Sequence, residues 1–319
     1  MRFITLIAEP NYSPKAIATY KELGEVYFWF DLSEAEKAAI LPRADILAVR
    51  LALTVDRQLL DKMPALKVIA TSTTGLNHID TAYAENKGIE IISLRGRTEF
   101  LEKIPSTAEE TMGLIIALLR NLPWAFEDVK NGHWNTNQWV GHQLSGKTLG
   151  IFGLGRLGKL VAGYALAFGM KVVAADPYVD EKDMAKLGVT KVAMEDLFKT
   201  ADVVSLHVLL QDDTRELIKA KHLQSMKPSS YLINTARAEL IERGLLEKAL
   251  KEKWIAGAAA DVLWDEKDDN SHLKNNPLIE YAQENQNLLI VPHIGGTTYE
   301  AKEITQDFIA DLAKKHLHK

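Results

Sequence analysis

The sequence contains no cysteine, and this absence excludes several kinds of chemistry. The chain can form no disulfide, no thiolate nucleophile and no metal site with cysteine ligands. The absence fits a reducing compartment, and we predict a cytoplasmic protein. No apolar run approaches the roughly 18 to 20 residues of a membrane helix. The apolar start meets Glu9 and Pro10 too soon for a signal peptide, so residues 2–8 are predicted to form a buried strand.

An excess of positive charge is lacking too. The 319 residues include 38 Lys and Arg against 43 Asp and Glu, a net charge of −5. Without a basic patch we expect no nucleic-acid partner. Hydrophobic residues make up 47% of the chain, which together with the low net charge indicates a globular protein rather than a disordered one. The length is sufficient for two domains with separate cores.

Short apolar runs alternate with helix-like stretches through the first third of the chain. The predicted strands are residues 2–8, 25–30, 45–49, 67–71 and 89–92, and the predicted helices are residues 14–23, 33–41, 55–61 and 79–86. Parallel strands need crossover connections, which helices usually supply. The alternation therefore predicts an α/β fold with a parallel sheet between two layers of helices.

A second series of the same kind begins near residue 147. A longer helix is predicted before it over residues 106–121, where Ser106 and Glu109 have the spacing of a capping box. Residues 127–145 then read as an irregular arm. Further strands are predicted near residues 147–153, 170–175, 202–207, 231–234, 255–261 and 288–291, and a last helix over residues 300–317. The chain is thus predicted to contain two doubly wound parallel-sheet domains.

The strongest local motif is a glycine-rich loop. Gly153, Gly155 and Gly158 follow a predicted strand and open a predicted helix, and Asp176 stands 18 positions after the last glycine, at the end of the next strand. This is the fingerprint of a dinucleotide site. The glycines let the backbone approach a pyrophosphate, and the acidic side chain accepts hydrogen bonds from the adenosine ribose.

The same loop favours NAD over NADP. The backbone N–H groups of Arg156 and Leu157 are expected to point at the pyrophosphate with the helix dipole behind them. The carboxylate of Asp176 would repel a 2′-phosphate, and Pro177 and Tyr178 supply no arginine to bind one. Two alternatives stay open on the loop alone: a tight turn that binds no ligand, and a methyltransferase that binds S-adenosylmethionine.

Three more segments with polar side chains follow predicted strands of the second series. Arg237 follows one strand, Glu266 lies in the segment after another, and His293 follows the last. Ligands of open α/β sheets bind beyond the carboxyl ends of the strands. One arginine, one glutamate and one histidine are therefore expected at the same edge as the dinucleotide.

These segments and several others make the sequence resemble the D-isomer-specific 2-hydroxyacid dehydrogenases over nearly its whole length. The matching stretches are residues 48–50 (AVR), 71–80 (TSTTGLNHID), 106–109 (STAE), 144–158 (LSGKTLGIFGLGRLG), 176–178 (DPY), 202–207 (DVVSLH), 234–237 (NTAR), 261–266 (DVLWDE) and 292–296 (PHIGG), in the order of the family. The resemblance implies a flavodoxin-like substrate domain and a Rossmann NAD-binding domain. We expect the substrate domain to comprise residues 1–97 and 293–319 and the NAD-binding domain residues 98–292.

The resemblance also implies roles for individual residues. Arg237, Glu266 and His293 match the catalytic residues, while Thr74 and Gly75 match a turn whose backbone holds the substrate carboxylate. Arg50, at the end of the third predicted strand, is a further candidate for substrate binding, with a surface role as the alternative. The expected NAD-binding residues are Gly153, Gly155, Arg156, Leu157, Gly158, Asp176, His207, Thr235, Ala236, Asp261 and Gly295. No metal site is expected.

The implied reaction is a reversible hydride transfer between nicotinamide and C2 of a small anionic 2-oxo or 2-hydroxy acid. His293 would be the proton donor, since histidine titrates near neutral pH. Glu266 would fix the tautomer of the His293 ring and favour its protonated form. Arg237 would bind the substrate carboxylate through two donors of its planar guanidinium. The alternatives are an NAD(H)-sensing scaffold without activity and an enzyme that oxidises an inorganic anion such as phosphite.

Some positions depart from the pattern of the family. Ala238 replaces a usual glycine, Leu209 replaces a usual proline, and Lys267 follows the glutamate where proline is common. Residues 95–105 are longer than the family norm, which puts the identity of the substrate in doubt. The predicted arm carries Trp124, Trp134 and Trp139 near or within it. They favour a homodimer, with packing on their own subunit as the alternative.

Overall fold

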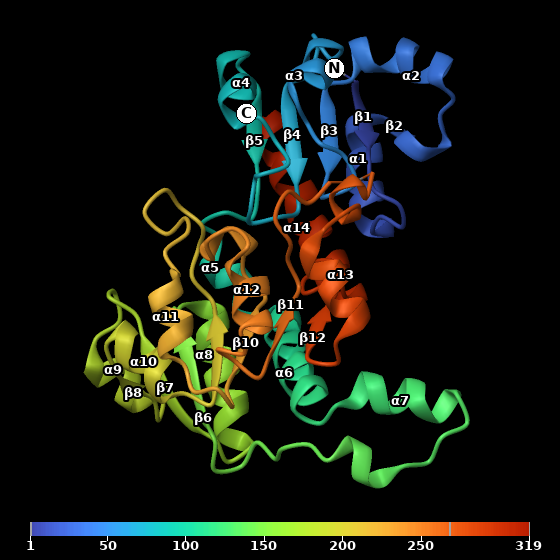
Figure 1. Cartoon of the computed structure of the whole chain (residues 1–319). Coiled ribbons are helices and arrows are strands. Elements are labelled where there is room, and N and C mark those ends of the chain that lie inside the picture. The colour runs from blue at the N-terminus through green and yellow to red at the C-terminus, as the bar shows by residue number, and fades with distance from the viewer. Residues whose placement is uncertain (1, 268, 319) are drawn as a thin grey trace. The chain divides into compact units, whose positions relative to one another are not determined.

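The computed structural model describes residues 2–267 and 269–318. The chain forms two compact units, whose elements are drawn in Figure 1. Unit 1 contains Met1–Ile104 and Thr297–Lys319, and unit 2 contains Pro105–Gly296. The predicted α/β fold with two parallel sheets is confirmed. In the described part of the chain, no helix has both the length and the apolar character of a membrane span.

Unit 1 is built on five parallel strands in the order β2-β1-β3-β4-β5. They are β1 (Phe3–Ile7), β2 (Gly24–Phe28), β3 (Ile46–Val49), β4 (Val68–Thr71) and β5 (Glu90–Ile92). This is the flavodoxin-like strand order. Every residue of β3 and β4 is buried, as expected for strands covered by helices on both faces.

The helices of unit 1 begin where the sequence offers good caps. They are α1 (Pro14–Leu23), α2 (Glu34–Ile40), α3 (Arg57–Asp61), α4 (Thr81–Asn86), α5 (Thr98–Leu101) and α14 (Tyr299–Leu317). Ser13 caps α1 ahead of Pro14, and a capping box of Ser33 and Glu36 opens α2. The backbone N–H of Ser13 also donates to Gln306 of α14 at 2.7 Å. This contact ties the C-terminal helix, red in Figure 1, to the first one.

Unit 2 is built on seven parallel strands in the order β12-β11-β10-β9-β6-β7-β8. They are β6 (Thr148–Phe152), β7 (Lys171–Ala175), β8 (Thr190–Lys191), β9 (Val203–Leu206), β10 (Tyr231–Asn234), β11 (Gly257–Ala260) and β12 (Leu288–Ile290). This is the Rossmann order extended by one strand. The two-residue strand β8 was not predicted, because so short a segment leaves no pattern in the sequence.

Helices cover both faces of the unit 2 sheet. The helices of unit 2, of which α7 does not lie on the sheet, are α6 (Ser106–Leu119), α7 (Leu122–Lys130), α8 (Arg156–Ala167), α9 (Glu181–Lys186), α10 (Met194–Thr200), α11 (Ala220–Ser225), α12 (Leu245–Lys251) and α13 (Pro277–Glu284). One apolar core joins α6 and α8 to the sheet. A second core joins α10, α11 and α12 to the opposite face.

Two local predictions around α6 are wrong. The helix begins at Ser106 itself, with Pro105 as its N-cap residue, and no side-chain capping bond forms. The predicted capping box of Ser106 and Glu109 is therefore absent. Helix α7 occupies the start of what was predicted as an irregular arm, because its interrupted apolar pattern was not recognised as helical. In Figure 1 this helix and the segment after it extend away from the sheet of unit 2.

The units divide slightly later in the chain than the divisions expected after residues 97 and 292. The first boundary follows Ile104, because Phe100 of α5 stacks on Phe308 of α14 with the ring centroids 3.8 Å apart. The second follows Gly296, since hydrogen bonds hold His293 and Gly295 to unit 2. Residues 1 and 319 of the expected substrate domain lie outside the described residues.

Candidate active site

The parallel strands of unit 2 bring most of the expected site residues to one edge of the sheet. Gly153 follows β6, Asp176 follows β7 and His207 follows β9. Thr235, Ala236 and Arg237 follow β10, and Asp261 follows β11. His293 and Gly295 follow β12. Because all pairings are parallel, these carboxyl ends lie along the same edge.

The glycine-rich loop has the shape that a pyrophosphate requires. Gly153 adopts a φ of 94°, which disfavours any side chain. A Cβ on Gly158 would lie 2.3 Å from the carbonyl oxygen of Gly153, so α8 packs too closely on the loop for a larger residue. A Cβ on Gly155 would meet nothing within 4 Å. The open space at Gly155, where α8 begins, is where a phosphate can approach the backbone.

Asp176 closes this loop at the end of β7. Its Oδ2 accepts a hydrogen bond from the N–H of Leu154 and its Oδ1 accepts one from the N–H of Tyr178, both at 2.8 Å. These bonds fix the carboxylate beside the loop, and each oxygen keeps a further lone pair. The arrangement therefore fits the expected contact with the ribose of a dinucleotide.

Two neutral polar groups continue the site along β9 and β10. The Nε2 of His207 lies 2.9 Å from the hydroxyl of Ser205. Burial lowers the pKa of His207 to about 4, so the ring is neutral at physiological pH. The hydroxyl of Thr235 lies 2.8 Å from that of Thr111 on α6. This part of the dinucleotide site thus carries hydrogen-bonding groups without charge.

A buried asparagine shapes the turn that carries Arg237. The Nδ2 of Asn234 donates to the carbonyl of Arg237, and its Oδ1 accepts from the N–H of Ala236. The guanidinium of Arg237 donates to the carbonyl of Ala236 at 2.6 Å. Asn234 was noted only as part of a matching stretch, since a sequence does not show which side chain of a turn folds back on it.

The side chains of Glu266 and His293 are in direct contact. The Nδ1 of His293 lies 2.6 Å from Oε2 of Glu266, and Oε1 of Glu266 accepts the N–H of Leu263 at 2.8 Å. Burial acts to raise the pKa of Glu266, but the hydrogen bond and charge of His293, with smaller effects of Leu263 and Arg237, outweigh it and lower that pKa. Glu266 is therefore a carboxylate at neutral pH, and its contact with Nδ1 orients the histidine ring.

The backbone around His293 is held in an unusual shape. His293 has a φ of 52°, in the left-handed region that costs energy for a residue with a side chain. Asp261, which is 2% exposed, holds the two residues that follow His293, namely Ile294 and Gly295. Its Oδ1 accepts the N–H of Ile294 at 2.6 Å, and its Oδ2 accepts that of Gly295 at 2.9 Å. We call His293, Ile294 and Gly295 the His293 turn.

Unit 1 carries the expected substrate-binding residues at the carboxyl edge of its own sheet. Arg50 follows β3, and Thr74 and Gly75 lie in the loop after β4. The hydroxyl of Thr73 donates to the carbonyl of Gly75 at 2.8 Å. Glu9, which follows β1, accepts the N–H groups of Arg50 and its two successors with Oε1, at 2.8 to 3.0 Å. In the sequence, Glu9 stands out only as an interruption of an apolar run.

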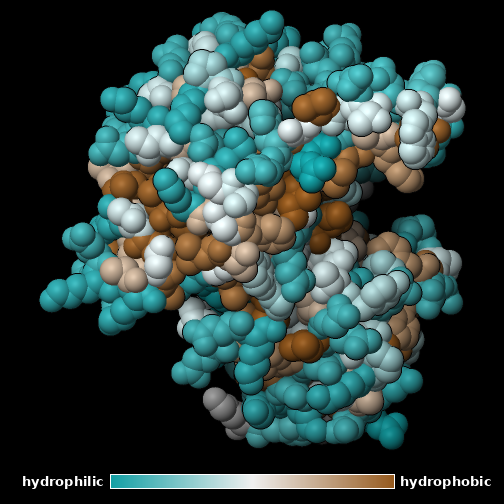
Figure 2. Space-filling view, turned by 90° about the horizontal axis from the view of Figure 1, so that it is seen from below, coloured by the Kyte–Doolittle hydropathy of each residue, from teal (hydrophilic) through white to brown (hydrophobic). Residues whose placement is uncertain are grey.

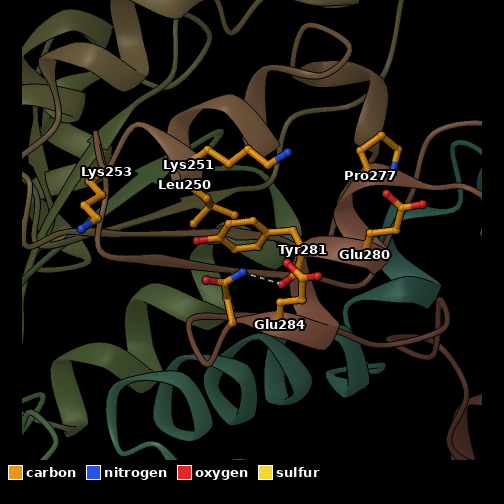
Figure 3. A pocket seen from close by; sticks show the side chains of 8 residues that line it. Leu250, Lys251, Lys253, Pro277, Glu280, Tyr281 and Glu284 are labelled. Atoms are coloured by element: carbon orange, nitrogen blue, oxygen red, sulfur yellow. Dashed lines mark hydrogen bonds between the residues drawn. The ribbon is translucent and has the colours of Figure 1, made fainter.

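A surface pocket of unit 2 lies away from these residues. It is formed between α12 and α13, and its lining includes Lys251, Lys253, Glu280 and Glu284 (Figure 3). None of the expected site residues lines it. This pocket carries charges of both signs and none of the expected site residues. The candidate active site is therefore the carboxyl edge of the sheet.

The comparison with protein families decides the classification. The model of the D-isomer specific 2-hydroxyacid dehydrogenase catalytic domain matches residues 5–201, and the model of the NAD binding domain of the same family matches residues 112–295. The chain belongs to the D-isomer specific 2-hydroxyacid dehydrogenase family. The resemblance inferred from the motifs is therefore confirmed, and NAD is the cofactor for which unit 2 is built.

Individual relatives match most of the chain. D-3-phosphoglycerate dehydrogenase of Methanocaldococcus jannaschii is 36% identical over 98% of this chain and 57% of its own length. Hydroxypyruvate reductase of Thermotoga maritima is 36% identical over 85% of this chain and 84% of its own. The crystal structure of D-lactate dehydrogenase from Aquifex aeolicus, complexed with NAD and lactic acid, matches with a TM-score of 0.80 at 28% identity, over 99% of this chain and 95% of that one. The chain spans about half the length of the D-3-phosphoglycerate dehydrogenases it matches.

Proposed function

We propose that the chain is an NAD-dependent D-2-hydroxyacid dehydrogenase. The observation that carries the proposal is the contact of 2.6 Å between Glu266 and His293, at the strand edge that holds the dinucleotide loop. A histidine charged by a carboxylate beside a nicotinamide site is suited to give a proton to a carbonyl oxygen. Arg237 from the neighbouring strand end supplies the positive charge that an anionic substrate needs.

Each residue of this chain has a distinct task in the proposed mechanism. When bound, NADH supplies the hydride for C2 of the substrate. Arg237 binds the carboxylate and polarises the carbonyl, and His293 gives its proton to the oxygen of C2. Glu266 keeps the ring oriented and stabilises its charge. In the oxidative direction His293 takes the proton back from the hydroxyl group.

The proposed substrate is a small 2-oxo or 2-hydroxy acid. Arg50, Thr74 and Gly75 are the proposed substrate-binding residues of unit 1, where the adjacent strands β3 and β4 carry them to one edge. Measuring NADH consumption with glyoxylate, hydroxypyruvate, pyruvate, phosphohydroxypyruvate and branched 2-oxo acids tests the proposal. We expect saturable turnover with at least one of these acids. Tight NADH binding without any turnover would favour the NAD(H)-sensing scaffold instead.

Asp176 supports a preference for NAD over NADP. Its carboxylate is fixed beside the glycine-rich loop by two backbone N–H groups, so it cannot easily move away from a 2′-phosphate. We expect kcat/KM to be much higher with NADH than with NADPH, and the ratio to fall in Asp176→Ala. An exposed aspartate elsewhere provides the control, and Asp212→Ala should leave the ratio unchanged. Equal use of both cofactors by the wild type would contradict this assignment.

Helix α7 supports a homodimer. Its Leu122, Phe126 and Val129 are 48%, 65% and 50% exposed and form an apolar strip. Trp139 instead packs on its own arm, where its Nε1 donates to Asp128 at 2.9 Å. Apolar residues gather in patches on the face seen in Figure 2, as is usual where a partner binds. Analytical ultracentrifugation should give a dimer that Phe126→Glu dissociates and Ile304→Lys, at an exposed site on α14, does not.

A further inference from the structure

The carboxyl group of Glu110 on α6 has unusual surroundings. Both of its oxygens are buried, and within the described residues no N–H or O–H group donates to either of them. An ionised carboxylate in such a place would lose its hydration without any compensation. The neighbouring Glu109, by contrast, is exposed. The two glutamates therefore have different environments although they are adjacent in the sequence.

A carboxyl group of the candidate site, that of Asp261, lies beside the carboxyl group of Glu110. A Cβ built on Gly295 would lie 2.5 Å from Oε2 of Glu110 and 3.0 Å from Oδ2 of Asp261. The two carboxyl groups thus flank the same glycine, and Asp261 is the residue that holds the His293 turn through two backbone N–H groups. Two carboxyl groups that flank the same glycine repel each other unless one of them carries a proton.

The titration of the pair agrees with this geometry. Burial, followed by the charge of Asp261 and a hydrogen bond with it, raises the pKa of Glu110 to about 8. Helix α6 packs against α8, β10, β11 and β12, and the charged or titratable residues nearest in sequence to these contacts are Arg156 at the start of α8, Arg237 after β10 and His293 after β12. Burial also raises the pKa of Asp261, but the backbone N–H groups of Gly295 and Ile294, the charge of His293 and the hydrogen bond with Glu110 act against this rise. Glu110 is therefore the member of the pair that keeps the proton.

We propose that Glu110 is a positioning residue, which stays protonated at neutral pH and donates a hydrogen bond to Asp261 so that Asp261 can hold the His293 turn. When Glu110 ionises, two carboxylates face each other beside Gly295. The repulsion moves Asp261 and loosens the backbone next to the proton donor. This inference rests on the proposed function, because it concerns the residue that would give the proton.

The first test is the pH profile of kcat/KM for reduction of the accepted 2-oxo acid by NADH. Loss of a proton from Glu110 near pH 8 should lower kcat/KM by roughly tenfold between pH 7 and pH 9, in addition to the effect of His293. In Glu110→Gln the amide still donates a hydrogen bond and cannot ionise. The alkaline limb of log kcat/KM should therefore approach a slope of −1 in this variant and −2 in the wild type.

Two further variants separate positioning from general damage. Glu110→Ala removes the donor, so kcat/KM should fall at every pH, and Glu110→Gln should recover most of the loss at neutral pH. Glu109→Gln changes an exposed carboxylate on the same helix and should keep the steep alkaline limb of the wild type. A limb of the same slope in Glu110→Gln and in the wild type would overturn the proposal.

The second test needs no catalysis. Because folding raises the pKa of Glu110, the folded chain holds a proton that the unfolded chain releases above its ordinary pKa, and stability should fall as the pH rises from about 5 to 8. Urea denaturation should show the folding equilibrium constant of the wild type falling by up to about tenfold per pH unit relative to Glu110→Gln. Parallel curves would overturn the proposal, whereas a chain that reduces no 2-oxo acid but shows this difference would overturn only the proposed function.

Discussion

Both units use a buried carboxylate to hold a loop, but the two loops carry different side chains. In unit 1, Glu9 follows β1 and holds the backbone that follows the neighbouring strand β3. In unit 2, Asp261 follows β11 and holds the backbone that follows the neighbouring strand β12. Each carboxylate satisfies N–H groups that would otherwise be unpaired at the end of a parallel sheet.

The difference lies in what the held loop carries. The loop held by Glu9 begins at Arg50, whose side chain is charged at every relevant pH. The loop held by Asp261 begins after His293, which pairs with Glu266, and Asp261 itself faces Glu110. The same backbone arrangement thus holds an arginine loop in unit 1, whereas in unit 2 it holds the turn of the proposed proton donor.

The largest expected effect comes from removing the titratable group that the unit 2 loop carries. His293→Ala should lower kcat by about 10² to 10⁴, the usual range for a lost general acid, while NADH affinity stays close to that of the wild type. Steady-state kinetics and NADH fluorescence titration would measure the two effects. His133→Ala, at an exposed histidine of the arm, is the control. Full turnover of His293→Ala would remove the proposed distinction between the two loops.

A methyl group at the glycine between the two carboxyl groups should have the next largest effect. Gly295→Ala places its Cβ 2.5 Å from Glu110 and 3.0 Å from Asp261, so the His293 turn must shift. We expect kcat/KM to fall by about tenfold or more, since small misplacements of catalytic groups are costly.

Gly113→Ala is the matched control, because its Cβ would meet nothing within 4 Å on the same helix as Glu110. An alanine inside a helix should raise the stability by about 0.5 to 1 kcal/mol, which thermal unfolding can detect. If both alanine variants keep full activity, the turn does not need the close approach seen at Gly295.

Glu266→Gln should shift the pH profile without abolishing activity. Reduction needs a protonated His293, so kcat/KM falls on the alkaline side as the ring loses its proton. The negative charge of Glu266, whose pKa is lowered by its contact with His293, favours the protonated ring. Neutralising it should move the alkaline limb toward lower pH. A limb that stays in place would contradict the pairing.

The smallest effect on catalysis should come from a change of Glu9, the carboxylate that holds the loop after β3 in unit 1. Glu9→Gln keeps an acceptor oxygen but loses the charge that three N–H groups share, and should reduce the free energy of unfolding by about 1 to 3 kcal/mol. The pH profile of kcat/KM should be unchanged. Urea denaturation and the pH profile would check both statements, with the exposed Glu85→Gln as the control. An altered pH profile in Glu9→Gln would show that the two carboxylates play the same part.

Much of this arrangement could be predicted from residue patterns. The alternation of apolar strands and helices predicted both parallel sheets, and parallel pairing alone places the residues after each strand at one edge. The fingerprint of Gly153, Gly155 and Gly158 located the dinucleotide loop because it depends on local backbone shape. The failures were also local: the expected cap of Ser106 gave way to Pro105, and α7 replaced the start of a predicted arm.

The sequence by itself determined the parallel α/β class of both sheets and the family. It also determined that Arg237, Glu266 and His293 follow strands of the second sheet, since each of these conclusions rests on a periodic pattern or a short motif. Only the tertiary structure decided that Glu9 and Asp261 hold the loops of neighbouring strands, and that Glu110 rather than Glu109 faces Asp261. The physical reason is that these contacts join segments far apart in the chain. Whether a carboxyl group there is charged depends on the burial and the partners that the fold gives it.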